Sequence, residues 1–445
     1  MQRISATLTL LLLSTLGLAA TPAAPGLPED PASIEHALSR LTYGVRPGDV
    51  DAVKKIGLAA WIDAQLTPSH GDDPALAAGL PEMPAPPATF ASPMEARRFG
   101  RQQVNTLASA KLIRAVYSDH QLEELLVDFW FNHFNVFAGK GRTSVYVPDY
   151  ERDAIRPHVL GRFRDLLEAT AKSPAMLFYL DNWQSTAPGF VPRVNRGQRG
   201  PSGLNENYGR ELMELHTLGV DGGYEQADVI DVARAFTGWT FDPRDGRFRF
   251  VPARHDRGAK RVLGQTIPAG GGIEDGERVL DILASHPATA RHLATKLVRR
   301  FVSDDPPPAL VERAAARFLA TKGDLREVVR TIVTSPEFFA ADVRHAKIKT
   351  PLEFVASAFR ATGSDVGNTA PALRALRDMG MAPYMCQPPT GYADTADAWV
   401  SSGALVSRMN FGTSLASGSL RGVSTPSTDG SSLALRLGSP EFQQR

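Results

Sequence analysis

The sequence at 96–131, ARRFGRQQVNTLASAKLIRAVYSDHQLEELLVDFWF, determines the fold class of this chain. Apolar residues recur every three or four positions across 96–117 and again across 121–131, which is the spacing of a helix with one buried face. Similar runs follow at 162–170, 174–180, 225–237, 275–301, 308–321, 324–334 and 351–361. Only 247–251 has a strand-like pattern. The sequence therefore predicts a mainly α fold: a single large multi-helix domain with long irregular loops and little strand.

Composition along the chain predicts three parts. Residues 1–24 combine an early basic residue with a short apolar core and small residues, which predicts a cleaved signal peptide and a periplasmic or extracellular location. Residues 25–411 form the expected helical domain, with irregular excursions rich in Pro and Gly at 68–94 and 184–204. Residues 412–445 are expected to be a Ser/Gly-rich linker followed by a short helix.

Charge and cysteine content exclude several classes of protein. With 49 basic and 48 acidic residues, the chain has no long-range field that would favour nucleic acid or an anionic membrane surface. No later apolar run reaches the roughly 18 residues of a membrane span. The single cysteine, Cys386, cannot form an intramolecular disulfide; it is either a buried packing residue, the commoner case, or a thiolate nucleophile. Zinc-ligand spacing, a nucleophile elbow and a dinucleotide fingerprint are missing from the sequence.

The densest group of candidate functional residues lies at 204–240, LNENYGRELMELHTLGVDGGYEQADVIDVARAFTGWT. If 206–218 is helical, its apolar residues share one stripe toward the core and its polar residues lie on adjoining faces. The candidate catalytic residues here are Arg210, Glu211, Glu214 and His216. The candidate binding residues are Asn205, Glu206, Asn207 and Trp239.

Asn132 and His133, in the motif FWFNHF at 129–134, form a second candidate site. An imidazole buried among aromatic rings is costly unless its nitrogens are satisfied. His133 is therefore either an ordinary core histidine or a catalytic partner of the 206–218 helix, and only a site would bring it close to that helix's carboxylates or to His216. A divalent metal is a candidate cofactor, with the candidate ligands His133, Glu211 and Glu214.

The 206–218 helix also has a purely structural interpretation. Glu206 and Arg210, four residues apart, would form a salt bridge on the helix surface. The other two carboxylates would then be solvated, and His216 would hydrogen-bond a backbone carbonyl in the core.

Two further segments leave alternatives open. The irregular excursion expected at 184–204 contains Arg193, Arg196 and Arg199. It is either a surface loop or a basic lid over an anionic ligand. Near the C-terminus, Asp394 or Thr395 is expected to cap the helix that follows.

Five ordered motifs together resemble the bacterial exported family catalogued as domain of unknown function 1800. They lie at 37–66, 129–134, 150–167, 205–229 and 391–411. The resemblance spans nearly the whole mature chain and implies export, a largely helical fold and, frequently, a neighbouring gene for an exported sulfatase-like protein, which is a candidate partner. It implies no established activity. Gly209, where the family usually has Ala, weakens a helix by about 1 kcal/mol and indicates close approach by another element.

Two hypotheses for function follow. The first is a hydrolase-type or metal-assisted acid/base enzyme that uses the His/Glu polar cluster. The second is a non-catalytic exported scaffold or carbohydrate-binding partner, with Trp183 and Trp239 as contact platforms. A buried cluster with shifted pKa values favours the first hypothesis, and an exposed aromatic patch favours the second.

Overall fold

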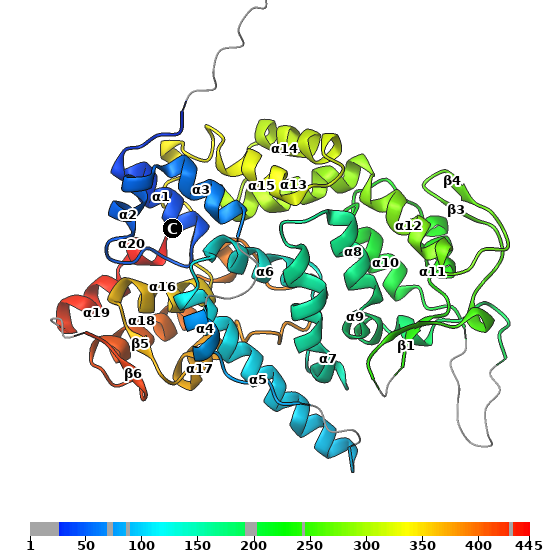
Figure 1. Cartoon of the computed structure of the whole chain (residues 1–445), viewed down its shortest axis with the longest axis horizontal. Helices are drawn as coiled ribbons and strands as arrows, with labels where there is room; N and C mark the ends of the chain where they lie inside the picture. The colour runs from blue at the N-terminus through cyan, green and yellow to red at the C-terminus, as the bar shows by residue number, and fades with distance from the viewer. Residues whose placement is uncertain (1–25, 69–73, 86–89, 192–202, 243–244, 427–429) are drawn as a thin grey trace, which may run out of the picture.

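The structure is a computed structural model that describes residues 26–68, 74–85, 90–191, 203–242, 245–426 and 430–445. Helices dominate this part of the chain, and its strands form only short two-stranded sheets (Figure 1). The predicted mainly α fold with little strand is confirmed. No helix in the described ranges is long and apolar enough to cross a membrane. The predicted signal peptide and the three loop arginines lie outside the described residues.

Most helices follow one another through short connections. The first half of the chain contains α1 (Pro31–Leu41), α2 (Asp49–Ile56), α3 (Leu58–Leu66), α4 (Pro74–Gly79), α5 (Pro93–Tyr117), α6 (Gln121–His133), α7 (Thr143–Asp149), the π-helix η1 (Tyr150–Ile155), α8 (Phe163–Lys172) and α9 (Pro174–Tyr179). The second half contains α10 (Asn207–Glu214), α11 (Gln226–Ala235), α12 (Glu274–Ala284), α13 (Pro287–Phe301), α14 (Pro308–Ala320), α15 (Leu325–Val333), α16 (Pro351–Thr362), α17 (Ala370–Asp378), α18 (Ser402–Ala416), α19 (Gly430–Gly438) and α20 (Pro440–Gln443).

The strands pair as antiparallel hairpins or bridges. These pairs are β1 (Trp239–Phe241) with β2 (Phe248–Phe250), β3 (Lys260–Val262) with β4 (Gln265–Ile267), and β5 (Asp365–Val366) with β6 (Val423–Ser424). The strand-like pattern at 247–251 therefore corresponds to β2.

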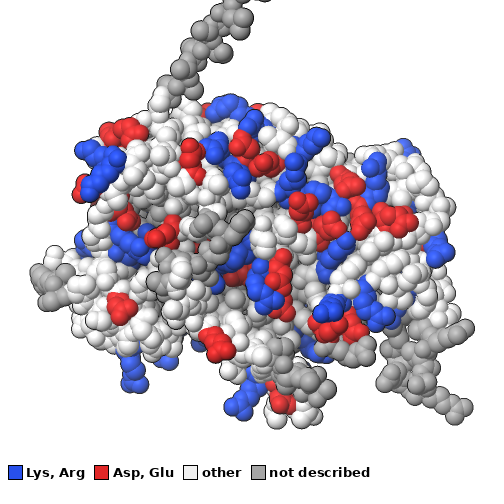
Figure 2. All heavy atoms as spheres, viewed as in Figure 1, with Lys and Arg blue, Asp and Glu red and all other residues white. Residues whose placement is uncertain are grey.

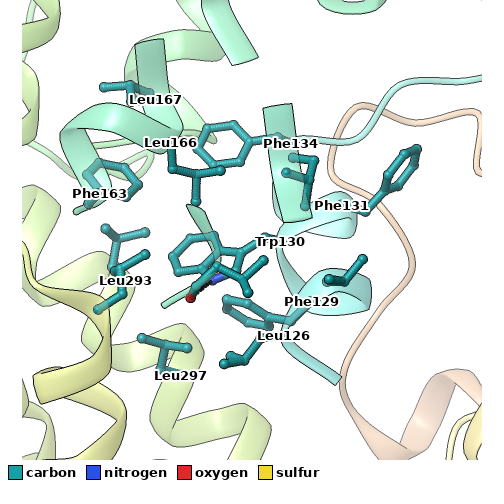
Figure 3. Packing of buried hydrophobic residues seen from close by; sticks show 14 of the residues in the cluster. Leu126, Phe129, Trp130, Phe131, Phe134, Phe163, Leu166, Leu167, Leu293 and Leu297 are labelled. Atoms are coloured by element: carbon teal, nitrogen blue, oxygen red, sulfur yellow. Dashed lines mark hydrogen bonds between the residues drawn. The ribbon is translucent and has the colours of Figure 1, made fainter. Parts of the chain in front are cut away.

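The aromatic residues of α6 lie at the centre of the larger hydrophobic core. Trp130 is fully buried, and its ring centroid lies 6.0 Å from that of Phe163 in α8. Its indole nitrogen donates to the backbone oxygen of Val159 at 3.2 Å. Leu293 and Leu297 of α13 belong to the same core and lie beside Trp130 in Figure 3. This packing fixes the C-terminal end of α6 against α13.

A second, smaller core surrounds α16, whose residues from Pro351 to Arg360 are all buried. The helix begins with a reciprocal cap, because Thr350 N donates to the Glu353 carboxylate at 2.8 Å and Glu353 N donates to the Thr350 hydroxyl at 3.3 Å. Leu433 and Leu437 of α19 lie in this core. The predicted C-terminal helix therefore packs against the rest of the described chain.

Helix α10 is shorter than the predicted 206–218 helix, because it ends at Glu214. The chain continues through wider turns, in which His216 N donates to Glu211 O at 3.0 Å and Leu218 N donates to Met213 O at 2.9 Å. His216 thus follows the helix instead of lying within it. Close approach at Gly209 is confirmed: a Cβ there would lie 3.1 Å from backbone atoms of α11.

Other boundaries also differ from the expectations. The run at 275–301 is divided into α12 and α13, because Pro287 starts a new helix that the His286 side chain caps. Helix α18 continues past the expected linker start at 412 to Ala416. Helix α4 lies within the excursion expected to be irregular.

Candidate functional site

A polar cavity of about 280 Å³ lies where α6, α13 and the segment 390–395 meet. Its charged and polar lining residues include Asp128, Asn132, His133, Lys296, Arg299, Arg300 and Asp394. These residues come from three distant parts of the sequence, and packing of α6 against α13 brings them together. We call this hollow the central cavity.

His133, at the C-terminal end of α6, is the buried imidazole of the central cavity. Its Nε2 lies 3.0 Å from the backbone oxygen of His216, and because a carbonyl only accepts, Nε2 carries the proton. Nδ1 is then the unprotonated nitrogen, and it is buried without a hydrogen-bond partner in the described chain. Burial, helped by the charge of Lys296, lowers the pKa of His133 well below 6.5. His133 is therefore a neutral imidazole with a free basic nitrogen.

Lys296 of α13 contributes an amine that has no hydrogen bond or ion pair to the residues the structure describes. Burial lowers its pKa from 10.5 to about 8, with Asp394 acting in the opposite direction and Arg299 adding to the decrease. A substantial fraction of the amine is thus neutral just above neutral pH. A neutral amine is both a base and a nucleophile.

Asp394 supplies the carboxylate on the opposite wall. One oxygen lies 3.3 Å from the guanidinium of Arg300, and the other, Oδ2, is buried without a hydrogen-bond partner in the described chain. The Asp394 backbone is held by Lys347, whose amine donates to its carbonyl oxygen at 3.0 Å. Next to it, Ala396 N donates to the Asp304 carboxylate at 2.8 Å. These contacts fix the position of the carboxylate in the cavity wall.

Asn132 joins α6 to the segment 390–395. Its side-chain oxygen accepts a hydrogen bond from Tyr392 N at 3.2 Å. Gly391 is required here, because it has a φ of +74° and a Cβ would lie 2.3 Å from the backbone oxygen of Asn132. The Tyr392 hydroxyl donates to Ala382 O at 2.7 Å. Asn132 therefore positions the loop that carries Asp394.

A buried network of charged residues, which includes the lining residue Asp128, supports the wall of the central cavity. Lys111 of α5 lies 3.0 Å from Asp128 and 3.6 Å from Glu151, which belongs to the π-helix η1. The Tyr384 hydroxyl donates to Glu151 at 2.7 Å. Although burial opposes ionisation, Lys111 and Arg156 hold the pKa of Glu151 below its ordinary value. The carboxylates of Asp128 and Glu151 already have partners. Their role is therefore to hold the cavity wall in place.

The structure brings His133 to His216, as the site hypothesis required, but not to the carboxylates of α10. The two imidazole centroids lie 6.3 Å apart. His216 is buried, its Nε2 has no partner in the described chain, and burial lowers its pKa to about 3. Its backbone oxygen, and not its ring, makes the hydrogen bond to His133. Neither Glu211 nor Glu214 lines the central cavity.

The polar face of α10 largely follows the structural interpretation. Arg210 lies 3.8 Å from Glu206 and 3.4 Å from Glu214, so the expected salt bridge is present and shared. Glu211 is half-buried instead of solvated, and burial together with the Glu214 charge raises its pKa. Gln226 of α11 donates to Glu206 at 2.8 Å.

The candidate binding residues at the start of α10 make structural hydrogen bonds. Asn205 donates to the Asp181 backbone oxygen at 3.1 Å and accepts from Asn207 N at 2.9 Å. Trp239 is fully buried, and its ring lies 4.8 Å from Phe236 between centroids. A buried indole offers no contact platform. These residues fix the chain path.

No three or more His, Cys, Asp or Glu residues in the described ranges are grouped so that they could hold a metal ion. The candidate ligands His133, Glu211 and Glu214 therefore do not form one such group. Cys386 is buried, and burial raises its pKa to about 11, so it is a thiol near neutral pH. This state fits the packing role.

Sequence reasoning missed the α13 side of the site. His292, Lys296 and Arg300 recur every four residues and so lie along one side of α13, next to its buried apolar face. That basic stripe is the signal that would have indicated a polar site. The expectation that Asp394 or Thr395 caps the following helix was wrong. Thr395 precedes the short 3-10 helix Ala396–Ala398 but its side chain makes no capping hydrogen bond, and Ser401 caps α18 by accepting from Ala404 N at 3.3 Å.

Comparison with known proteins gives one result. The model of a family described as "Protein of unknown function (DUF1800)" matches residues 36–444. No curated protein and no solved structure matches the chain.

Proposed function

The chain belongs to the DUF1800 family of proteins of unknown function, as its motifs predicted, and on this premise we propose from its geometry that it is an acid/base enzyme. The central cavity is the proposed active site. The proposed substrate is a small, negatively charged molecule or the charged end of a longer one. The volume of about 280 Å³ lies near the lower end of small-molecule sites, roughly 300–1,000 Å³.

One observation carries this proposal: three polar groups that line the same cavity each have an atom without a partner in the described chain. They are His133 Nδ1 and Asp394 Oδ2, which are both buried, and the amine of Lys296, whose side chain is partly exposed. A buried polar atom left unsatisfied costs about 1–3 kcal/mol. Such a cost is commonly found where the groups are needed for a ligand or a reaction.

The charges of the cavity wall favour an anionic substrate. Asp128 pairs with Lys111, and Asp394 lies 3.3 Å from Arg300, which also pairs with Glu353 at 2.8 Å. Arg299 has no carboxylate partner in the described chain and makes only a backbone hydrogen bond, to Asp304 O at 3.3 Å. Together with the amine of Lys296 it leaves an excess of positive charge, which stabilises a carboxylate, phosphate or sulfate.

The roles of the three groups follow from their protonation. His133 has an unprotonated nitrogen without a partner, so it is the proposed proton acceptor, and its lowered pKa makes it a weak base. Lys296, with a pKa of about 8, exchanges a proton readily near neutral pH and is the proposed second acid/base group. Asp394 orients the substrate or accepts a hydrogen bond from it. Arg299 binds the anionic group.

This enzyme is proposed to act outside the cytoplasm, and an exported sulfatase-like protein stays a proposed partner. The alternative, a carbohydrate-binding scaffold, required exposed aromatic platforms. Trp239 is fully buried, and Trp183 is stacked on Phe178 with centroids 5.8 Å apart. The buried cluster with lowered pKa values supports the enzyme over the scaffold.

The proposal is tested by turnover. The purified protein is incubated with pools of small carboxylates, phosphate esters and sulfate esters, and consumption is followed by mass spectrometry. We expect turnover to fall about 100-fold or more in both His133→Asn and Lys296→Met, since positioned acid/base groups contribute that much. Lys54→Gln, an exposed lysine of α2, is the control and should keep full activity. Turnover that survives both cavity substitutions would place the activity elsewhere.

A further inference from the structure

A second hollow, larger than the central cavity, lies away from it. It has a volume of about 730 Å³ and is bounded by the N-terminal part of α5, the segment 138–144, α17 and the chain that follows α17. Helix α5 extends along the lower edge of the molecule in Figure 1. We call this hollow the arginine groove, after its three basic residues Arg97, Arg101 and Arg377.

The charge of the arginine groove is unbalanced. Its described lining contains no Asp or Glu, and Arg97, Arg101 and Arg377 form no ion pair within the part of the chain that the structure describes. Arg97 and Arg101 lie four residues apart on α5, where like charges repel by a few tenths of a kcal/mol. Basic and acidic side chains are intermixed over much of the face in Figure 2, and the whole chain has a net charge of only +1. The groove is a local exception to this balance.

The floor of the groove is apolar. Val104 and Ala108 of α5 line it, together with Ala138, Leu373 and Met385. Met385 remains 43% exposed, which is high for a large apolar side chain in a concave surface. Three cations at the rim and an apolar floor are the complement of a ligand with an anionic head and a hydrocarbon or aromatic body.

We propose that the arginine groove binds a small amphiphilic anion, such as an alkyl carboxylate or an alkyl phosphate. Its volume lies within the roughly 300–1,000 Å³ of small-molecule sites. The guanidinium groups bind the anionic head through charge-assisted hydrogen bonds. Asn105 and Ser144 add polar groups to the lining. This proposal does not depend on an activity in the central cavity, because none of its residues lines that cavity.

Calorimetric titration with decyl phosphate, below its micelle concentration, tests the proposal. The neutral counterpart is decyl glucoside. We expect saturable binding of decyl phosphate, weakened by salt, and at least about tenfold weaker binding of the glucoside, since each charge-assisted hydrogen bond contributes about 1.5–3 kcal/mol. The variant Arg97→Gln/Arg101→Gln/Arg377→Gln should lose at least about tenfold in affinity.

A control variant that removes two neighbouring charges is Arg98→Gln/Arg374→Gln. These arginines are exposed, lie on the same two helices and do not line the groove, so their removal should leave the affinity within about twofold. Equal losses in the two variants would overturn the proposal, because they would reflect net charge alone. Absence of saturable binding would overturn it as well. Sedimentation with phosphatidylglycerol vesicles, without binding of monomeric decyl phosphate, would assign the groove to a membrane surface instead.

Discussion

Two clusters of this molecule each contain a buried histidine and a lysine, and they differ in whether the polar atoms have partners. In the first, Asp275 of α12 lies 3.1 Å from His255 and 2.7 Å from Lys260. His255 also contacts the backbone oxygen of Thr237 at 2.8 Å, so both ring nitrogens have partners. In the second, the central cavity, His133 has one partner and Lys296 has none in the described chain.

Residues whose polar atoms all have partners stabilise the fold. Residues with unpartnered polar atoms can bind a ligand or take part in a reaction. The amine of Lys260 donates to Asp275, to Gly258 O at 2.9 Å and to a further backbone oxygen, so all its hydrogens are used. A ligand would have to displace these bonds. In the central cavity a ligand would instead satisfy atoms that are unsatisfied, and its binding would be favoured by that gain. Residue type alone does not distinguish the two clusters.

The largest predicted effect is loss of the shared carboxylate in the satisfied cluster. Asp275→Asn leaves the buried charge of Lys260 without its counter-charge, and we expect unfolding free energy to fall by about 3–5 kcal/mol. Urea denaturation followed by circular dichroism measures this. Asp281→Asn, on the same helix, is the control: its carboxylate is 52% exposed and should contribute less than about 1 kcal/mol. Similar losses in both variants would contradict the assignment of a buried structural cluster.

An opposite effect is predicted for the cavity lysine. Because the folded-state pKa of Lys296 is about 8, below the ordinary 10.5, the unfolded chain binds the proton more tightly. The charged lysine therefore destabilises the fold below pH 8, and this cost disappears as pH rises to 10.5. Lys296→Met should raise unfolding free energy by about 1–3 kcal/mol at neutral pH, a gain that shrinks above pH 8.

Urea denaturation at several pH values, with Lys54→Gln as the exposed control, measures this gain. A decrease in stability at neutral pH would mean that Lys296 has a stabilising partner, and would remove the contrast with Lys260.

The sequence predicts the helices well, because their apolar spacing is local information. The FWFNHF motif also indicates the core, since Trp130 and its neighbours must be buried somewhere. Contacts between residues far apart in the sequence cannot be predicted from local residue spacing. Lys296 and Asp394 come together only through the packing of α13 against a loop, and the contact of His133 with the His216 backbone depends on where α10 ends. That end is a wide backbone turn, which no side-chain pattern specifies.

The same locality explains why the predicted site residues do not all line one cavity. Glu211 and Glu214 stand out in the sequence because they are close together on one helix, yet they lie outside the central cavity. Asp394 resembles a helix cap by its position before α18, but its carboxylate contacts Arg300. Which polar groups the fold leaves without partners is a property of the packed chain, and the proposed active site rests on that property.

The smallest predicted effect is removal of the cavity histidine. His133→Asn loses one hydrogen bond, to the His216 backbone, and should lower unfolding free energy by about 1 kcal/mol. His255→Asn loses contacts at both nitrogens and should cost about twice as much. Because the pKa of folded His133 lies well below 6.5, wild-type stability decreases as pH falls below 6.5, and His133→Asn should reduce that decrease. Urea denaturation from neutral to acidic pH measures both variants. If His133→Asn cost as much as His255→Asn, His133 would be a structural residue with a second partner, and the proposed base would be lost.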